Sequence, residues 1–173
     1  MNTDEALAAG IAKFLKEANA KAPGSVFTEF SSPLSVDVIP TGALSLDFAL
    51  GAGGIPRGRI IELYGPEGSG KTSLALSVCA NAIRLGHAAG YVDVENALTF
   101  DHVKWMGVDT KYFVVAQPDS AEAALQEVER MCNSLLYGVV VVDSVASLTP
   151  QAELNGEIGD QNMALVARLL SPA

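Results

Sequence analysis

Residues 65–72 have the types and spacing of a phosphate-binding loop. They read Gly-Pro-Glu-Gly-Ser-Gly-Lys-Thr and fit the pattern G-x-x-x-x-G-K-[ST] between a predicted strand and a predicted helix. Glycines let backbone N–H groups wrap a phosphate chain, and the following helix directs its positive end at the same phosphates. Lys71 can bring a positive charge to the β- and γ-phosphates and assist their transfer, and the Thr72 hydroxyl can bind Mg²⁺. The residues expected to contact the nucleotide here are Gly65, Pro66, Glu67, Gly68, Ser69, Gly70, Lys71, Thr72 and Ser73.

Two apolar segments end in carboxylates that could complete this site. Residues 139–142 are four valines followed by Asp143, and the segment 90–95 carries Asp93 and Glu95 at its end. Ligands of parallel α/β sheets bind at the carboxyl ends of the strands, so we expect these acids at one edge. Asp143 is predicted to hold the magnesium shell. Glu95 is the candidate to polarise an attacking water, and Asp93, on the same strand, competes for that role.

Strand and helix patterns alternate around these motifs. We expect strands at 59–64, 89–94, 112–116 and 139–142, and helices at 44–50, 73–85, 100–106 and 119–136, with 26–41 extended. Asp119 is the predicted cap of the last helix, whose apolar face would be Leu125, Val128, Cys132 and Leu135. A run of four valines suits a strand that is buried on both faces. The alternation predicts an α/β fold with a mostly parallel central sheet between helices.

A further helix is predicted before this core. Thr3 can cap it, Asp4 and Glu5 lie in its first turn, and the segment from Lys21 to Gly24 ends it. Its apolar residues lie on one stripe at helical spacing: Leu7, Ile11, Phe14, Leu15 and Ala18. Two interpretations stay open. The stripe either packs on its own domain or docks on a neighbouring copy of the chain.

The composition limits the class of protein. The 173 residues are 49% apolar, which excludes a disordered chain. There is no apolar run long enough to cross a membrane and no basic N-terminal signal, so we expect a soluble cytoplasmic protein. Cys79 and Cys132 are too few for a disulfide scaffold, and we expect both to be buried apolar residues.

The charge argues against a broad basic surface for nucleic acid, since the formal net charge is −9. From residue 112 onward the cations are Arg130 and Arg168, against eight acids. Any contact with DNA must therefore be local, use backbone amides, or be built by assembly of several copies.

The phosphate loop and its flanks resemble the RecA family of bacterial recombinases. The residues leading into the loop carry this resemblance: from 45 to 67 they read Ser-Leu-Asp-Phe-Ala-Leu-Gly-Ala-Gly-Gly-Ile-Pro-Arg-Gly-Arg-Ile-Ile-Glu-Leu-Tyr-Gly-Pro-Glu. The segments 93–98, 117–119, 142–150 and 156–160 then follow in the family's order. The resemblance covers nearly the whole chain, from the first helix to Leu170, and is more specific than the phosphate loop alone.

The resemblance implies a RecA-type ATPase core that uses ATP and Mg²⁺. Lys71 and Thr72 would bind ATP and magnesium, Asp143 would support the magnesium, and Glu95 would activate water. Gln117 would lie near the nucleotide, in a role left open.

Two positions depart from the family pattern. His102 stands where the family usually has an aromatic residue for adenine to stack on. Imidazole can stack, alone or with Phe100 or Trp105, although His102 could equally be a solvated helix residue. Asn96 stands beside Glu95 where a histidine is common, a mild change because the carboxylate remains.

The resemblance also implies DNA as a partner. The segment that matches the family's first DNA-binding loop is Leu154, Asn155, Gly156, Glu157, Ile158, Gly159, Asp160, Gln161 and Asn162. Its glycines let the backbone approach a phosphate, and amides need no basic side chains. Residues 1–35 match the arm that docks on the adjacent protomer, and 36–173 the ATPase core. The whole protein would coat single-stranded DNA as a helical filament, hydrolyse ATP and exchange strands with duplex DNA in recombination, repair and the SOS response to DNA damage.

The sequence stops at residue 173, partway along what resembles the helix after that loop. We therefore expect a C-terminally incomplete core, without the strand that would lie between 59–64 and the strand ending at Asp143. Whether such a chain hydrolyses ATP alone stays open. Two other classes also stay open: a related helicase-like motor, and a non-catalytic chain that docks on and regulates a full-length recombinase.

Overall fold

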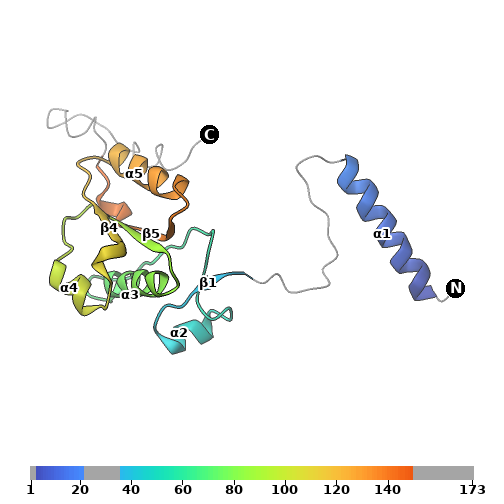
Figure 1. Ribbon diagram of the computed structural model, residues 1–173, viewed down its shortest axis with the longest axis horizontal. Helices are drawn as coiled ribbons and strands as arrows, with labels where there is room; N and C mark the ends of the chain where they lie inside the picture. The colour runs from blue at the N-terminus through green and yellow to red at the C-terminus, as the bar shows by residue number, and fades with distance from the viewer. Residues whose placement is uncertain (1–2, 22–35, 150–173) are drawn as a thin grey trace. The chain divides into compact units, whose positions relative to one another are not determined.

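The computed structural model describes residues 3–21 and 36–149, and the chain divides into two compact units, 1–35 and 36–173. The described part of the first unit is one helix, α1 (Thr3–Lys21), with Asp4 and Glu5 in its first turn (Figure 1). Leu7 and Ile11 of its apolar stripe are exposed. No helix within 3–21 or 36–149 is both long and apolar enough to cross a membrane.

The second unit contains a parallel sheet of three strands, as the alternation of patterns predicts. Its strands are β3 (Ala88–Asp93), β4 (Phe113–Ala116) and β5 (Tyr137–Asp143), in the order β4-β3-β5. The helices α3 (Lys71–Arg84), α4 (Phe100–Trp105) and α5 (Ala121–Asn133) alternate with them along the chain, with the short 3₁₀ helices η1 (Thr110–Tyr112) and η2 (Val145–Ser147). The α/β fold class is thus confirmed.

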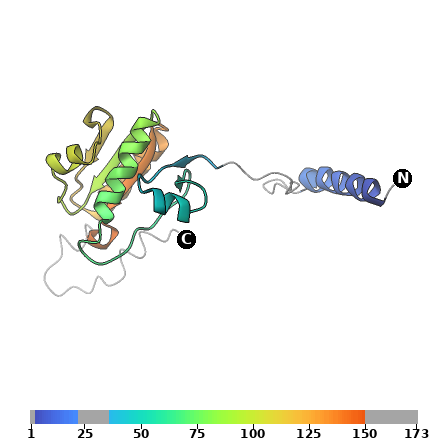
Figure 2. The ribbon, with the colours of Figure 1, turned by 90° about the horizontal axis from the view of Figure 1, so that it is seen from below.

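Helices α3 and α5 cover opposite faces of this sheet, as Figure 1 shows. Successive residues of a strand point to opposite faces, and β5 follows this rule. Val139 and Val141 pack toward the α3 side, while Val140 and Val142 pack toward the α5 side. Figure 2 shows α3 lying along the sheet. The two apolar layers hold the carboxyl ends of β3 and β5 side by side, with Asp93 paired to Asp143.

A short antiparallel pair adjoins α3. Strand β1 (Val38–Ile39) pairs with β2 (Ile55–Pro56), and α2 (Leu44–Ala49) lies between them in the chain. Side chains of α3 hold the segment that follows β1, since Ser77 Oγ donates to the Thr41 carbonyl (2.7 Å) and Asn81 Nδ2 donates to the Pro40 carbonyl (2.8 Å).

The predicted strand at 59–64 is wrong, because this segment forms no strand ladder with the described residues. A strand exists only where a neighbour supplies its hydrogen bonds, and β5 pairs on one side with β3 alone among the strands of 36–149. The side chains of Ile60 and Tyr64 are accordingly exposed (102% and 88%). For the same reason the residues of β5 are half-buried rather than buried on both faces.

The last helix also differs from its prediction. Ser120, not Asp119, is its cap and accepts from the Ala123 backbone N–H. The helix stops at Asn133 rather than 136, because Leu135 adopts a left-handed conformation (φ 59°) that a helix cannot contain. Its buried residues are Ala121, Ala124 and Met131, and Val128 of the predicted stripe packs against the same core, whereas Cys132 and Leu135 of that stripe are exposed.

The two cysteines, Cys132 in α5 and Cys79 in α3, differ in burial. Cys132 is exposed, contrary to expectation, whereas Cys79 is buried in the core under α3 as predicted. Burial raises the pKa of Cys79 to about 12, so it remains a neutral thiol that packs as an apolar residue.

Candidate functional site

The glycine-rich loop opens directly onto the N-terminus of α3. Gly70, the residue before the helix, is left-handed (φ 89°), a conformation that glycine adopts without strain. Within 36–149 no side chain caps this end, so the first backbone N–H groups of α3 are available to an anion. The helix dipole adds positive potential at the same place.

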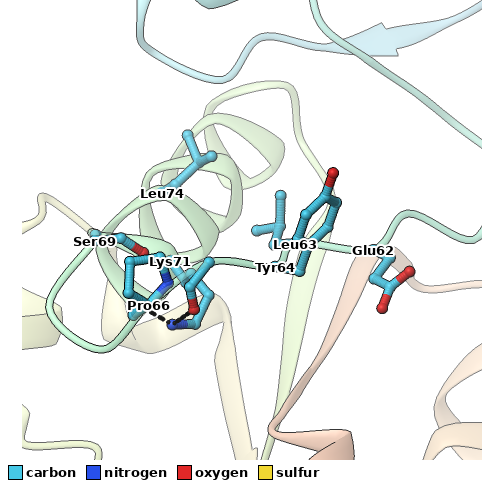
Figure 3. A pocket seen from close by; sticks show the side chains of 9 residues that line it. Glu62, Leu63, Tyr64, Pro66, Ser69, Lys71 and Leu74 are labelled. Atoms are coloured by element: carbon cyan, nitrogen blue, oxygen red, sulfur yellow. Dashed lines mark hydrogen bonds between the residues drawn. The ribbon is translucent and has the colours of Figure 1, made fainter.

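Lys71 lies folded against this loop. Its ammonium donates to the carbonyls of Gly65 and Pro66, both at 3.0 Å, as the dashed lines in Figure 3 show. Carbonyls are neutral acceptors, and a phosphate oxygen would form a stronger, charge-assisted hydrogen bond. The lysine can therefore leave the loop for a phosphate.

The loop borders a pocket of about 450 Å³ beside the first turn of α3 (Figure 3). Its walls combine loop residues with the preceding apolar segment. The lining residues are Glu62, Leu63, Tyr64, Gly65, Pro66, Ser69, Gly70, Lys71 and Leu74. Five of the residues predicted to bind nucleotide line this pocket, namely Gly65, Pro66, Ser69, Gly70 and Lys71, whereas Glu67, Gly68, Thr72 and Ser73 of the same prediction do not.

A hydrogen bond at the base of the loop joins α3 to β5. Thr72 Oγ1 donates to Asp143 Oδ2 at 2.8 Å, across 71 positions of sequence. Hydroxyl and carboxylate oxygens are the hard donors that Mg²⁺ prefers, and this ion usually takes one or two protein groups, waters and substrate phosphates. No group of three or more His, Cys, Asp or Glu side chains suited to a metal occurs in the described part of the chain. The Thr72–Asp143 pair therefore fits a magnesium held jointly with a phosphate.

The structure separates the two acids at the end of β3. Asp93 is buried (2% exposed), and its oxygens accept from the backbone N–H groups of Ala97 and Leu98, both at 3.1 Å. Gln117 Nε2 also donates to it, at 3.2 Å. Asp93 thus fixes the segment after β3 and has no access to a water above the sheet. Gln117 acts on that carboxylate.

Glu95 is exposed at the same edge. Its Oε1 accepts from Ser144 Oγ (2.6 Å) and Ser147 Oγ (2.8 Å), and the two hydroxyls lie 3.1 Å apart. Ser144 directly follows Asp143 and Ser147 ends η2, so these contacts tie Glu95 to the end of β5. The carboxylate keeps a second oxygen with which it could orient a water.

His102, a residue of α4, lies beside the first turn of α3. Its Nε2 is 3.4 Å from Ser73 Oγ, and its ring centroid is 6.4 Å from that of Trp105, with the rings tilted by 37°. Thr99 begins α4 by accepting from the His102 backbone N–H (3.3 Å). The ring therefore lies next to the loop helix, and both Trp105 and Phe100 are largely exposed.

Sequence reasoning missed three hydroxyls at this edge. Tyr91 OH donates to Asp143 Oδ2 at 2.6 Å, and Ser144 and Ser147 hold Glu95. The period of two was a usable signal for Tyr91, since it places this residue two before Asp93 on the same face of β3. The predicted DNA contacts, Leu154 to Asn162, lie outside the described residues.

The parallel sheet, the glycine-rich loop before α3 and the acids at neighbouring strand ends form an arrangement that is typical of α/β proteins that bind nucleotides. A comparison with family models matches residues 10–173 to the RecA N-terminal domain. The chain belongs to the RecA family.

Individual relatives agree with this assignment. The chain is 54% identical over 138 residues to "Protein RecA" of Acidothermus cellulolyticus, which covers 80% of this chain and 40% of the relative. It is 55% identical over 138 residues to "Protein RecA" of Thermus thermophilus, again 80% of this chain and 41% of that protein. The protein of the same name from Thermus aquaticus is 54% identical over 140 residues, 81% of this chain and 41% of its own length. The chain thus spans about two fifths of the length of these relatives.

Proposed function

We propose that this chain carries the nucleotide site of an ATP- and Mg²⁺-dependent DNA recombinase. The observation that carries the proposal is the Thr72–Asp143 hydrogen bond, which joins the glycine-rich loop to the acidic end of β5. The loop alone could bind many anions. Together with a hydroxyl and a carboxylate at 2.8 Å, it has the donors that a magnesium nucleotide needs.

Each part of the site has a proposed role. The backbone N–H groups of the loop and of α3 hold the phosphates, and Lys71 moves from its carbonyl partners to the β- and γ-phosphates. Thr72 and Asp143 hold Mg²⁺, which would neutralise charge on the phosphates when bound. His102, whose ring lies beside Ser73, would stack on the base.

Glu95 is the proposed group that orients the attacking water. Its exposure and its position at the end of β3 favour it over Asp93, whose oxygens are buried and hydrogen-bonded. Ser144 and Ser147 keep one oxygen of Glu95 in place, which leaves the other for a water. Positioned general bases typically contribute about 10²- to 10⁴-fold in rate.

The partners are proposed from family membership. Residues 154–162 would contact DNA through backbone amides, and α1 would dock on the next protomer of a filament. The apolar stripe of α1, which includes Leu7 and Ile11, is the surface that would dock. A filament repeats a weak DNA contact many times, so an acidic chain can still bind single-stranded DNA firmly. The proposed role is homologous pairing and strand exchange in DNA repair, in the cytoplasm.

The first test measures binding of a fluorescent ATP analogue to the 173-residue chain with Mg²⁺ present. We expect saturable binding that weakens by at least about tenfold in Lys71→Ala, because one charge-assisted contact is worth roughly 1.5–3 kcal/mol. Lys111→Ala is the matched control, since this lysine stacks on Tyr112, away from the loop. Equal affinity of Lys71→Ala and the unaltered chain would refute the nucleotide site.

The second test measures phosphate release from ATP with and without single-stranded DNA. We expect stimulation by DNA that Lys71→Ala abolishes. Glu95→Gln should bind the analogue normally and turn over at least about 10²-fold more slowly. Turnover by Glu95→Gln equal to that of the unaltered chain would remove Glu95 from the reaction and leave the binding site intact.

A further inference from the structure

A buried tyrosine lies under the proposed magnesium site. Tyr91 is in the middle of β3 and is 0% exposed, and its hydroxyl donates to Asp143 Oδ2 at 2.6 Å. This distance is typical of a hydrogen bond from O–H to an ionised carboxylate. An ionised carboxylate can only accept hydrogen bonds, so the phenol is the donor of this pair.

Two donors meet on one oxygen. Thr72 Oγ1, from the first turn of α3, donates to the same Asp143 Oδ2 at 2.8 Å. Asp143 at the end of β5 is thus held from β3 by Tyr91 and from α3 by Thr72. The Thr72 hydroxyl and the buried phenol together fix the direction of the Asp143 carboxylate.

The phenol itself has little freedom to move. Its ring meets the Phe113 ring edge-on, with centroids 5.9 Å apart and planes at 61°, and it packs with Leu76 and Cys79 in the core between α3 and the sheet. A close-packed interior holds side chains in single rotamers. Tyr91 is therefore a rigid support, whereas Thr72 lies in the first turn of α3, directly after the loop that must accommodate a ligand.

We propose that Tyr91 is a positioning residue of the metal site, whose hydroxyl holds the Asp143 carboxylate in the orientation that binds the magnesium of a nucleotide complex. This inference rests on the proposed function, since it names a further residue of the same site. Hydrogen-bond partners of metal-binding carboxylates commonly change metal affinity by about 10- to 100-fold when removed.

The direction in which Tyr91→Phe changes the affinity for Mg²⁺ distinguishes a positioning role from a purely electronic effect. A phenol that donates to a carboxylate withdraws charge from it, so a purely electronic effect predicts stronger Mg²⁺ binding in Tyr91→Phe. Loss of positioning predicts weaker binding. The substitution removes one oxygen atom from a buried ring and keeps the shape of the core, so the fold is expected to remain.

The experiment measures the dissociation constant of a fluorescent ADP analogue for the 173-residue chain, once in Mg²⁺ and once in EDTA. We expect Tyr91→Phe to reduce the affinity gained from Mg²⁺ by about tenfold and to leave the affinity in EDTA unchanged. The control is Tyr137→Phe, the same chemical change at the opposite end of the sheet, and it should alter neither value.

Three results would overturn the proposal. An unchanged or larger gain from Mg²⁺ in Tyr91→Phe would exclude positioning. An equal loss of affinity in Mg²⁺ and in EDTA would show that Tyr91 supports only the fold. No binding of the analogue by the unaltered chain would instead refute the proposed function, and this inference with it.

Discussion

Three carboxylates lie at one edge of the sheet, and they differ in burial and in hydrogen-bond partners, and therefore in what each can bind. Asp93 is buried and saturated by backbone and amide donors, Asp143 is held by two hydroxyls, and Glu95 is exposed. The sequence predicts that these acids meet, because each ends an apolar segment. It does not predict which is buried, since that depends on the segment 94–98 folding back over Asp93. The choice between Asp93 and Glu95 therefore needed the structure.

The first prediction at this scale concerns Asp93. Asp93→Ala removes the acceptor for Ala97 N–H, Leu98 N–H and Gln117, and leaves these donors without their partner. The free energy of unfolding should fall by roughly 2–4 kcal/mol, as urea denaturation followed by circular dichroism would measure. Glu95→Ala is the matched control and should change it by less than about 1 kcal/mol, because this side chain is exposed. Similar losses in both variants would contradict the division of roles.

At the scale of elements, local pattern predicts helices and buried strands well. The helices α2, α3 and α4 and the strands β3, β4 and β5 lie within a few residues of their predicted bounds, because apolar period and end signals are carried by the segment itself. The prediction of a strand at 59–64 fails for a physical reason. The composition of this segment is that of a strand, yet a strand also needs a partner, and partners are set by the rest of the chain.

The β1–β2 pair gives a prediction of its own. A methyl group at Gly54 would lie 2.5 Å from the Ile39 carbonyl oxygen and 2.9 Å from Pro40 N, and neither backbone atom can swing aside. Gly54→Ala should therefore destabilise the protein by about 1–3 kcal/mol. Gly10→Ala in α1 meets nothing within 4 Å and should increase the helical circular dichroism signal, because alanine is favoured over glycine in helices by up to about 1 kcal/mol. A neutral Gly54→Ala would show that β1 and β2 are not closely paired in solution.

At the scale of the whole molecule, several large apolar side chains within the described residues 36–149 are exposed. Leu44, Phe48, Ile60 and Tyr64 are each more than 80% exposed. Isolated exposed apolar residues are ordinary, whereas several in neighbouring segments indicate a surface that binds protein or promotes association. This exposure bears on stability, since a side chain that is not buried contributes nothing to the folded state through packing.

Ile60 makes that statement testable. Ile60→Ser should leave the free energy of unfolding within about 0.5 kcal/mol of the original, because the side chain has no burial to lose. Ile39→Ser is the matched control. Ile39 is 2% exposed, and the same substitution there should cost at least about 3 kcal/mol through lost apolar burial and a cavity. Sedimentation at high concentration should show less self-association for Ile60→Ser than for the unaltered chain. If Ile60→Ser instead lowers stability as much as Ile39→Ser does, then residues 59–64 are packed in solution, and the missing strand ladder next to the phosphate loop is formed there after all.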